Sequence, residues 1–256
     1  MTVVKIGGSV LFPGPRVSGF TCLNGTISRL KNLKGGKIIV HGTGFFGKKP
    51  AKDHDYHRDG VIDPLSMPVE KIRLALLKAH CVFLEFLVKK GLRAVSLDPA
   101  SIFSPGKKLA LKDFSPVKRL LALGIVPVVR GDVLFFGRSA RAVSSDEMAQ
   151  LLSLAAFPER TVFITNTKGL LGPGGKTLGK ALNSRLPAVI AGIRPSSGDV
   201  SGGMRGKMLQ VKKISDAGID VLIGNAFSDF SAPAGGTFEG TFIYGKKKNK
   251  RHNPGL

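Results

Sequence analysis

Tryptophan is absent from this chain of 256 residues, and tyrosine and cysteine occur only twice each. The two cysteines, Cys22 and Cys81, are too few for a disulfide framework, so we expect a protein of the reducing cytoplasm. Nucleic-acid binders tend to interleave aromatic residues with basic ones. Most of the 16 phenylalanines here lie in apolar runs that predict a core, so the sequence does not favour binding to nucleic acid.

Long apolar runs are also missing. None reaches the roughly 18 residues of a membrane-spanning helix, so we expect no membrane partner. We expect no signal peptide, because Lys5 and two glycines interrupt the apolar stretch at the start. Acidic residues are scarce, with 17 against 39 lysines and arginines, which gives a net charge of +22. This charge favours anionic partners such as nucleic acid, an acidic surface or a phosphorylated small molecule.

Apolar, β-branched runs alternate with helical patterns along the chain. The 43% hydrophobic content is sufficient for a real core. We expect a first strand that ends near Ile6 and further strands at residues 37–41, 92–97, 125–129, 161–166 and 219–224. We expect helices at residues 69–91, 114–123, 145–154 and 203–217. This alternation predicts an α/β fold with a mainly parallel sheet.

Glycine and small polar residues follow five of these strands. The segments are Gly7-Gly8-Ser9, Gly42-Thr43-Gly44, Arg130-Gly131-Asp132, residues 165–169 and Gly224-Asn225. Ligands of parallel sheets bind beyond the carboxyl ends of the strands, so we expect these loops to form one site. Backbone N–H groups beside a lysine form a cradle for an anion such as phosphate. An ordinary strand-to-loop exit is the alternative for the first segment.

Two further stretches have biased composition. Residues 170–202 are rich in glycine, proline and serine, which predicts a mobile lid or connector. Residues 245–256 form a basic, low-complexity tail that we expect to be disordered. The remaining residues, 1–244, are expected to form one domain.

Six segments carry a resemblance to a known family. They are VVKIGGSVL, VHGTGFFG, GIVPVVRGDVLF, VSSDEMAQLL, TVFITNTKGLL and DVSGGMRGKM, in that order. On these motifs, residues 2–243 resemble the amino acid kinase superfamily. The resemblance implies a three-layer α/β/α sandwich, in which residues 1–158 bind a phosphoryl acceptor and residues 159–244 bind the nucleotide. It also implies ATP as donor, Mg²⁺ held largely by phosphates and water with no protein metal ligand, and a homodimer.

Within the superfamily, HGTGFFG, AVSLDPASIF and EGTFI are similar to segments of isopentenyl phosphate kinases. The stretch KDHD at residues 52–55 is similar to one in fosfomycin-resistance kinases. The resemblance therefore implies an ATP-dependent kinase of a small phosphate monoester similar to isopentenyl phosphate. The first alternative is a kinase of a phosphonate such as fosfomycin. The second is a non-catalytic protein on the same scaffold that binds phosphate or nucleic acid.

The resemblance also implies roles for individual residues. Lys5 would bridge the donor and acceptor phosphates, Lys207 would reach the β- and γ-phosphates, and Asp132 would organise the lysines. A structural ion pair is the alternative for Asp132, and an exposed helical lysine is the alternative for Lys207. Asp146 begins a predicted helix, so helix capping explains it as well as catalysis does.

The implied ATP contacts are Lys5, Gly7, Gly8, Ser9, Thr165, Gly169, Gly203 and Lys207. The implied acceptor contacts are Gly42, Thr43, Gly44, Lys48, His54, Gly131 and Asp132.

Three positions depart from the family pattern. Lys48 stands where these kinases carry a histidine that contacts the acceptor phosphate, and His54 lies near enough in sequence to replace it. Gly14 stands where the family has a lysine, with Arg16 nearby. The loop at residues 165–169 reads TNTKG and lacks both aspartates of the usual TDVDG. These changes leave the identity of the acceptor open.

Overall fold

The computed structural model describes residues 1–15, 20–53, 61–65, 68–172, 175–193, 203–230 and 238–246. Its central element is an eight-stranded sheet. In order across the sheet, the strands are β11 (Lys180–Leu182), β13 (Thr241–Tyr244), β12 (Asp220–Gly224), β10 (Arg160–Ile164), β1 (Thr2–Ile6), β2 (Lys37–His41), β7 (Val126–Arg130) and β4 (Ala94–Ser96). The strands from β12 to β4 run parallel, whereas β13 pairs antiparallel with β12. The predicted α/β fold with a mainly parallel sheet is confirmed.

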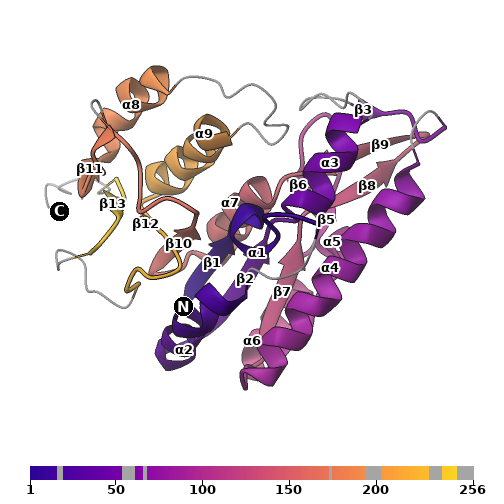
Figure 1. The fold of residues 1–256 in the computed structure, drawn as a ribbon, viewed down its shortest axis with the longest axis horizontal. Helices are drawn as coiled ribbons and strands as arrows, with labels where there is room; N and C mark the ends of the chain where they lie inside the picture. The colour runs from indigo at the N-terminus through magenta and orange to yellow at the C-terminus, as the bar shows by residue number, and fades with distance from the viewer. Residues whose placement is uncertain are drawn as a thin grey trace, which may run out of the picture.

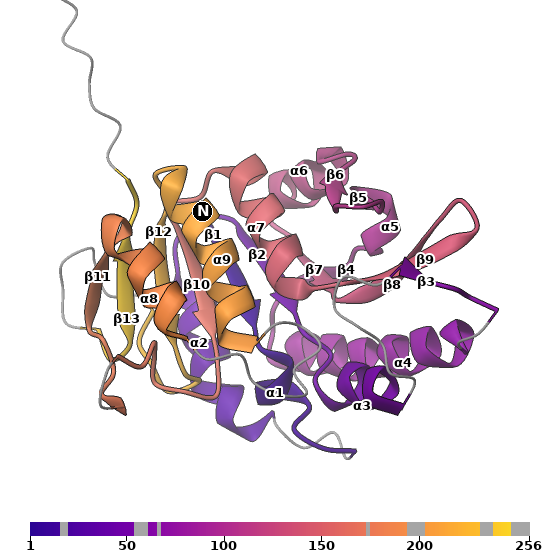
Figure 2. The same cartoon turned by 90° about the horizontal axis from the view of Figure 1, so that it is seen from above.

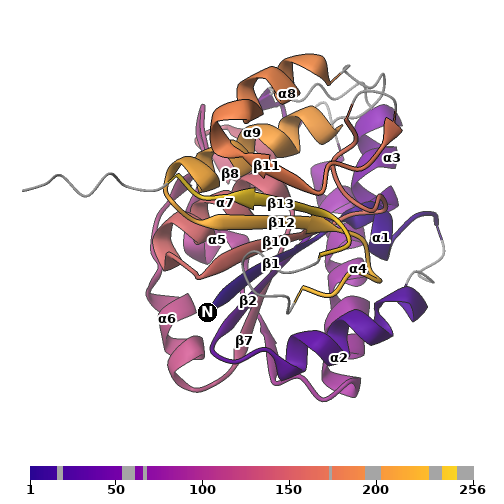
Figure 3. The same ribbon diagram turned by 90° about the vertical axis from the view of Figure 1, so that its left-hand side faces the viewer.

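Helices cover both faces of this sheet (Figures 1 and 3). One face carries α1 (Gly8–Leu11), α2 (Asn24–Asn32), α3 (Phe45–Asp53) and α4 (Val69–Lys89). The other face carries α5 (Pro99–Ile102), α6 (Ser115–Ala122), α7 (Ser145–Ala156), α8 (Leu186–Gly192) and α9 (Gly203–Asp216). The three layers of the predicted sandwich are therefore present.

The side chains of β1 alternate between the two helical layers, as the period of two in a strand requires. Val4 and Ile6 pack in the core cluster that includes residues of α2 and α4. Val3 packs in the opposite cluster with residues of α7 and α9. By the same alternation, Lys5 lies on the side of the sheet that α7 and α9 cover, where it meets Asp146 of α7. Figure 2 shows α7 and α9 next to each other over this face. The strand pattern thus decides which helices the lysine meets.

A three-stranded antiparallel sheet extends from the sandwich beside α3 and α4 (Figure 1). It consists of β3 (Val61–Ile62), β9 (Ser139–Val143) and β8 (Asp132–Phe136). Its apolar residues pack on α4 in a small third core. A separate hairpin joins β5 (Phe103–Ser104) to β6 (Ala110–Leu111).

The sequence-based expectation for residues 170–202 is wrong for the part that the structure describes. This stretch contains β11 and α8, and Leu186 and Ile190 of α8 are buried in the core. Residues 173–174 and 194–202 lie outside the described residues. From residue 247 on, the predicted tail also lies outside them. Among the helices described, none has the length and apolar character needed to cross a membrane.

Candidate active site

A cavity of about 610 Å³ lies beyond the carboxyl ends of the parallel strands. Four of the five predicted loops line it, namely those after β1, β2, β7 and β10, together with the first turns of α7 and α9. The fifth loop, Gly224-Asn225, does not line the cavity. Instead, the Gly224 carbonyl accepts hydrogen bonds from the Thr165 N–H at 2.7 Å and from its hydroxyl at 3.3 Å. The fifth loop therefore supports the fourth.

Lys5, Asp146 and Lys207 meet in this cavity. The Lys5 ammonium lies 2.7 Å from Asp146 Oδ1, and the Lys207 ammonium lies 2.8 Å from Oδ1 and 3.1 Å from Oδ2. The three side chains come from β1, α7 and α9 and are buried. The predicted convergence of Lys5 and Lys207 is confirmed, and one carboxylate holds the two lysines together.

Burial and charge act against each other on these groups. Burial lowers the pKa of Lys5 most, Asp146 opposes this effect, and Lys207 lowers it further, so the pKa of Lys5 is about 8. Burial would raise the pKa of Asp146, but Lys207 and Lys5 outweigh it and hold the pKa below its ordinary value. Asp146 is therefore ionised at neutral pH and balances part of the lysine charge.

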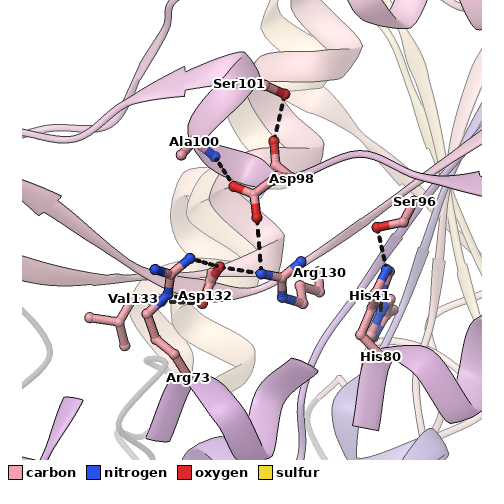
Figure 4. Close-up of polar contacts among 10 residues, drawn as sticks. All are labelled: His41, Arg73, His80, Ser96, Asp98, Ala100, Ser101, Arg130, Asp132 and Val133. Carbon is pink, nitrogen blue, oxygen red and sulfur yellow. Dashed lines mark hydrogen bonds and ion pairs between the residues drawn. The ribbon is translucent and has the colours of Figure 1, made fainter. Parts of the chain in front are cut away.

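Asp132 does not organise the lysines, so that prediction is wrong. Its carboxylate accepts hydrogen bonds from Arg130 at 2.7 Å, from Arg73 at 3.2 and 3.3 Å, and from the Val133 N–H at 2.9 Å (Figure 4). Asp132 begins β8 and binds Arg130 of β7 and Arg73 of α4, whereas Lys5 and Lys207 meet at Asp146 of α7. The alternative of a structural ion pair describes Asp132 correctly.

The first residue after each of three strands uses its N–H group to continue the sheet. Gly7 donates to the Ile164 carbonyl at 2.8 Å, Gly42 to that of Ile6 at 2.9 Å, and Gly131 to that of His41 at 3.0 Å. The expectation that Gly7 and Gly42 donate to phosphates is therefore wrong. In the first two loops, the N–H groups without a partner in the described part of the chain are those of Gly8, Ser9, Thr43 and Gly44.

The first two glycine loops also pack directly on each other. A Cβ atom on Gly8 would overlap the backbone of Gly44, and one on Gly44 would overlap the carbonyl oxygens of Gly8 and Phe12. Gly44 also has a φ of +51°, which favours glycine. The glycines are thus required by the contact between the two loops, quite apart from any ligand.

The structure locates most of the remaining predicted residues. Ser9, Lys48, Gly131, Thr165 and Gly203 line the cavity. Gly169 does not, because it packs against Thr177 and Thr241 instead. His54 and Arg16 lie outside the described residues.

The end of the cavity near α4 has an apolar wall that the sequence did not indicate. It is formed by Ile62, Ile72, Leu76 and Val133. Beside it, Arg141 of β9 and Glu147 of α7 form an ion pair at 3.2 Å. The pattern SARAV at residues 139–143 could have indicated a strand that carries Arg141. Nothing in the sequence pairs Arg141 with Glu147. The cavity therefore combines a cationic end with an apolar end.

The fold and the cavity define an α/β protein whose lysines and glycine loops line one cavity at the carboxyl edge of a parallel sheet. The chain belongs to the amino acid kinase family, whose family model matches residues 1–225.

Several characterised relatives match along nearly the whole chain. The isopentenyl phosphate kinase of Methanocaldococcus jannaschii is 26% identical over 258 residues, covering 95% of this chain and 98% of the relative. That of Methanothermobacter thermautotrophicus is 27% identical and covers 88% of this chain and 91% of the relative. A crystal structure of an isopentenyl phosphate kinase substrate complex is similar in fold, with a TM-score of 0.75 at 19% identity, covering 95% of this chain and all of the other.

Proposed function

We propose that this protein is an ATP-dependent kinase that transfers the γ-phosphoryl group to the phosphate of isopentenyl phosphate or a similar small monoester. The observation that carries the proposal is the cluster of Lys5, Asp146 and Lys207 in a cavity that two glycine loops also line. The relatives described above carry this activity in their names. Phosphoryl transfer needs mainly positioning and charge stabilisation, which two held lysines can supply.

Each side of the cavity would hold one phosphorylated molecule. Lys5 would lie between donor and acceptor, because β1 separates the loop of Gly42 from the loop of Thr165. Lys207 would neutralise charge on the ATP phosphates, and the N–H groups of Gly8 and Ser9 would donate to them. On the acceptor side, the N–H groups of Thr43 and Gly44 would bind the acceptor phosphate, with Lys48 nearby.

The apolar wall favours a hydrocarbon acceptor. Ile62, Ile72, Leu76 and Val133 offer a surface against which an isoprenoid chain would bury, and each buried methylene contributes about 0.8 kcal/mol. A phosphonate as small as fosfomycin would use less of this surface. The wall therefore favours isopentenyl phosphate over fosfomycin, which remains the second candidate acceptor.

Mg²⁺ would enter with ATP. The cavity-lining carboxylates of Asp132, Asp146 and Glu147 are each paired with a cationic side chain. Among the described residues, no group of three or more histidine, cysteine or acidic side chains could hold a metal ion. We therefore assign the coordination of Mg²⁺ mainly to phosphate oxygens and water, as is usual for this ion.

A coupled assay of ADP release tests the proposal. Purified protein with ATP and Mg²⁺ should release ADP when isopentenyl phosphate is added, and more slowly with fosfomycin. Lys207→Ala should lower turnover by a factor of about a hundred or more, since it removes a charge-stabilising donor. Absence of turnover with either acceptor, together with salt-dependent binding to nucleic acid, would favour a non-catalytic binding protein.

We also propose a homodimer formed through α4. This helix carries an exposed or half-exposed apolar stripe with alternating spacings of three and four residues. The α4 stripe consists of Leu74, Leu77, Cys81, Leu84 and Val88. Such a spacing fits the seam between two paired helices. The occupant that we propose is the same stripe of a second copy, crossing antiparallel near Cys81.

Light scattering after size-exclusion chromatography tests the dimer. The wild type should elute as a dimer, and Leu77→Glu should elute as a monomer because it buries a charge in the seam. Lys78→Glu, one residue away, is the matched control and should stay dimeric. A dimer that persists in Leu77→Glu would place the interface elsewhere.

The two cysteines form no disulfide, which suits the cytoplasmic location that we propose.

A further inference from the structure

Two buried histidines lie on the face of the sheet opposite Lys5, and the proposed chemistry does not use them. His41 is the last residue of β2, His80 lies on α4, and Ser96 is the last residue of β4. His41 Nε2 lies 2.8 Å from His80 Nδ1, and His80 Nε2 lies 2.7 Å from Ser96 Oγ (Figure 4). His41 Nδ1 lies 3.1 Å from the Gly42 carbonyl oxygen. The chain of contacts therefore ends on the second glycine loop.

The direction of each hydrogen bond follows from the last acceptor. A carbonyl oxygen can only accept a hydrogen bond, so His41 Nδ1 carries a proton and donates a hydrogen bond to the Gly42 carbonyl oxygen. In a neutral His41, Nε2 then accepts from the Nδ1–H of His80. His80 Nε2 in turn accepts from the Ser96 hydroxyl. Both rings are thus neutral Nδ1–H tautomers, and the bonds run in one direction from Ser96 to Gly42.

The surroundings keep both rings neutral. Burial lowers the pKa of His41 most, and His80 lowers it next. The bond to Gly42 opposes them, but Arg130 and Lys5 lower the pKa further, to about 3. Burial and Arg130 lower the pKa of His80 to about 4, against a smaller opposing effect of Asp98. Arg130 pairs in register with His41 on the adjacent strand and is 1% exposed, so its charge lies close to the rings.

Fixing the Gly42 carbonyl also fixes the next N–H group. In a planar trans peptide, the carbonyl of Gly42 and the N–H of Thr43 point in opposite directions. A carbonyl held towards His41 therefore turns the Thr43 N–H away from the histidines. Thr43 lines the cavity, and its N–H has no partner in the described part of the chain.

We propose that His41, His80 and Ser96 are positioning residues that hold the Gly42 peptide so that the Thr43 N–H points at the phosphoryl acceptor. This inference rests on the proposed function for the identity of that acceptor. It assigns no chemical step to the histidines, which touch neither substrate. Their effect should therefore fall on binding of the acceptor and spare binding of ATP.

The first test measures the tautomers directly in the wild-type protein. With ¹⁵N-labelled histidine, long-range ¹H–¹⁵N correlation spectra at neutral pH should show two neutral rings protonated at Nδ1. The variants His41→Gln and His80→Phe assign the two rings. An Nε2–H tautomer or a doubly protonated ring at either position would overturn the proposed direction of the hydrogen bonds. This result does not depend on the enzyme's substrate.

The second test uses two variants at His41. Asparagine places its amide nitrogen close to the position of Nδ1 and keeps the bond to Gly42, whereas glutamine places its amide near Nε2 and loses it. With isopentenyl phosphate, His41→Gln should raise KM about tenfold, which corresponds to one hydrogen bond, and His41→Asn should restore most of the loss. KM for ATP should change less than about twofold in both variants.

Equal losses in the two variants, or a parallel rise in KM for ATP, would show a merely structural role for His41. If the wild type does not phosphorylate isopentenyl phosphate, the proposed function fails. The spectra then still decide whether the histidines hold the Gly42 peptide.

Discussion

Asp146 accepts hydrogen bonds from two lysines that lie far apart in the chain, Lys5 on β1 and Lys207 on α9. Without this carboxylate, two ammonium groups would face each other in a buried site. A buried pair is costly to break because the remaining charge is left without compensation. At the scale of single residues, the site therefore depends more on Asp146 than on any other carboxylate in the cavity.

Asp146→Asn should affect both stability and turnover. We expect a loss of about 3 kcal/mol in the free energy of unfolding, because two buried lysines lose their counter-charge. Turnover should fall by a factor of about a hundred or more, since the lysines are no longer held in place. Urea denaturation and the ADP-release assay measure the two effects.

Asp132→Asn is the matched control for this substitution. It should also lower stability, because Arg130 and Arg73 lose their partner, but turnover should fall much less. A larger loss of turnover in Asp132→Asn than in Asp146→Asn would contradict the assignment.

The lowered pKa of Lys5 predicts an alkaline limit for ATP binding. In the free protein Lys5 is charged below a pH of about 8 and neutral above it, whereas an ordinary lysine stays charged to about pH 10.5. Because a neutral amine does not attract phosphate, kcat/KM for ATP should fall above pH 8, and this parameter reports groups of the free enzyme. Lys5→Arg retains its charge at these pH values, so its residual activity should lack the fall.

The same shift fixes the sign of the stability change with pH. Between pH 8 and pH 10.5 the unfolded chain binds a proton at Lys5 that the folded protein has released. The contribution of Lys5 therefore makes the folded state more stable as pH rises through this range. Lys5→Met should remove that rise in urea denaturation measured across the range.

At the scale of elements, the site depends on the contact between the loops after β1 and β2. Their backbones approach so closely at Gly8 and Gly44 that neither position has room for a Cβ atom. The strands themselves are held in register by pairing from Thr2 with Lys37 to Ile6 with His41. The two loops therefore form one closely packed unit that lines the cavity.

Gly44→Ala should destabilise this unit strongly. We expect a loss of about 3 kcal/mol or more, since the new methyl group overlaps the backbone and the positive φ disfavours alanine. Gly137→Ala separates the two effects, because Gly137 has a φ of +54° but no atom within 4 Å of the place that a methyl group would occupy. That control should lose only about 1 kcal/mol in chemical denaturation. Equal losses would remove the argument from close packing.

At the scale of the whole molecule, the dominant feature is the net charge of +22. A strongly positive protein attracts anionic ligands over several ångströms, and salt screens this attraction. ATP and a phosphate monoester are both anions. The overall charge should therefore act on the encounter with substrates and not on the transfer step.

Ionic strength should consequently separate binding from chemistry. Raising KCl from about 20 to about 200 mM should lower kcat/KM for ATP roughly threefold or more and leave kcat nearly unchanged. An uncharged osmolyte such as sucrose at matched osmolarity is the control and should have little effect. A kcat that falls in parallel with kcat/KM would point to an effect of salt on the active site itself.

The amino-acid sequence alone was enough to predict the parallel sheet and the loops at its carboxyl edge. The strand β2 covers the predicted residues 37–41, and α4 begins at the predicted Val69, because apolar periodicity is a local property of the chain. The sequence did not predict α3, which contains a glycine and a proline, or α8, which lies within the stretch 170–202 that is rich in glycine, proline and serine. Both helices are held in place by their packing against other elements.

The family resemblance implied that Lys5 and Lys207 converge, but the carboxylate that joins them could be learned only from the packed molecule. Asp132 and Asp146 both lie next to predicted elements, and no local signal distinguishes the aspartate that reaches the lysines from the one that reaches the arginines. No local signal indicates the contact between His41 and His80 either, because it depends on how α4 packs against the end of β2. Local periodicity specifies strands and helices, whereas contacts between distant side chains depend on which faces of those elements pack together.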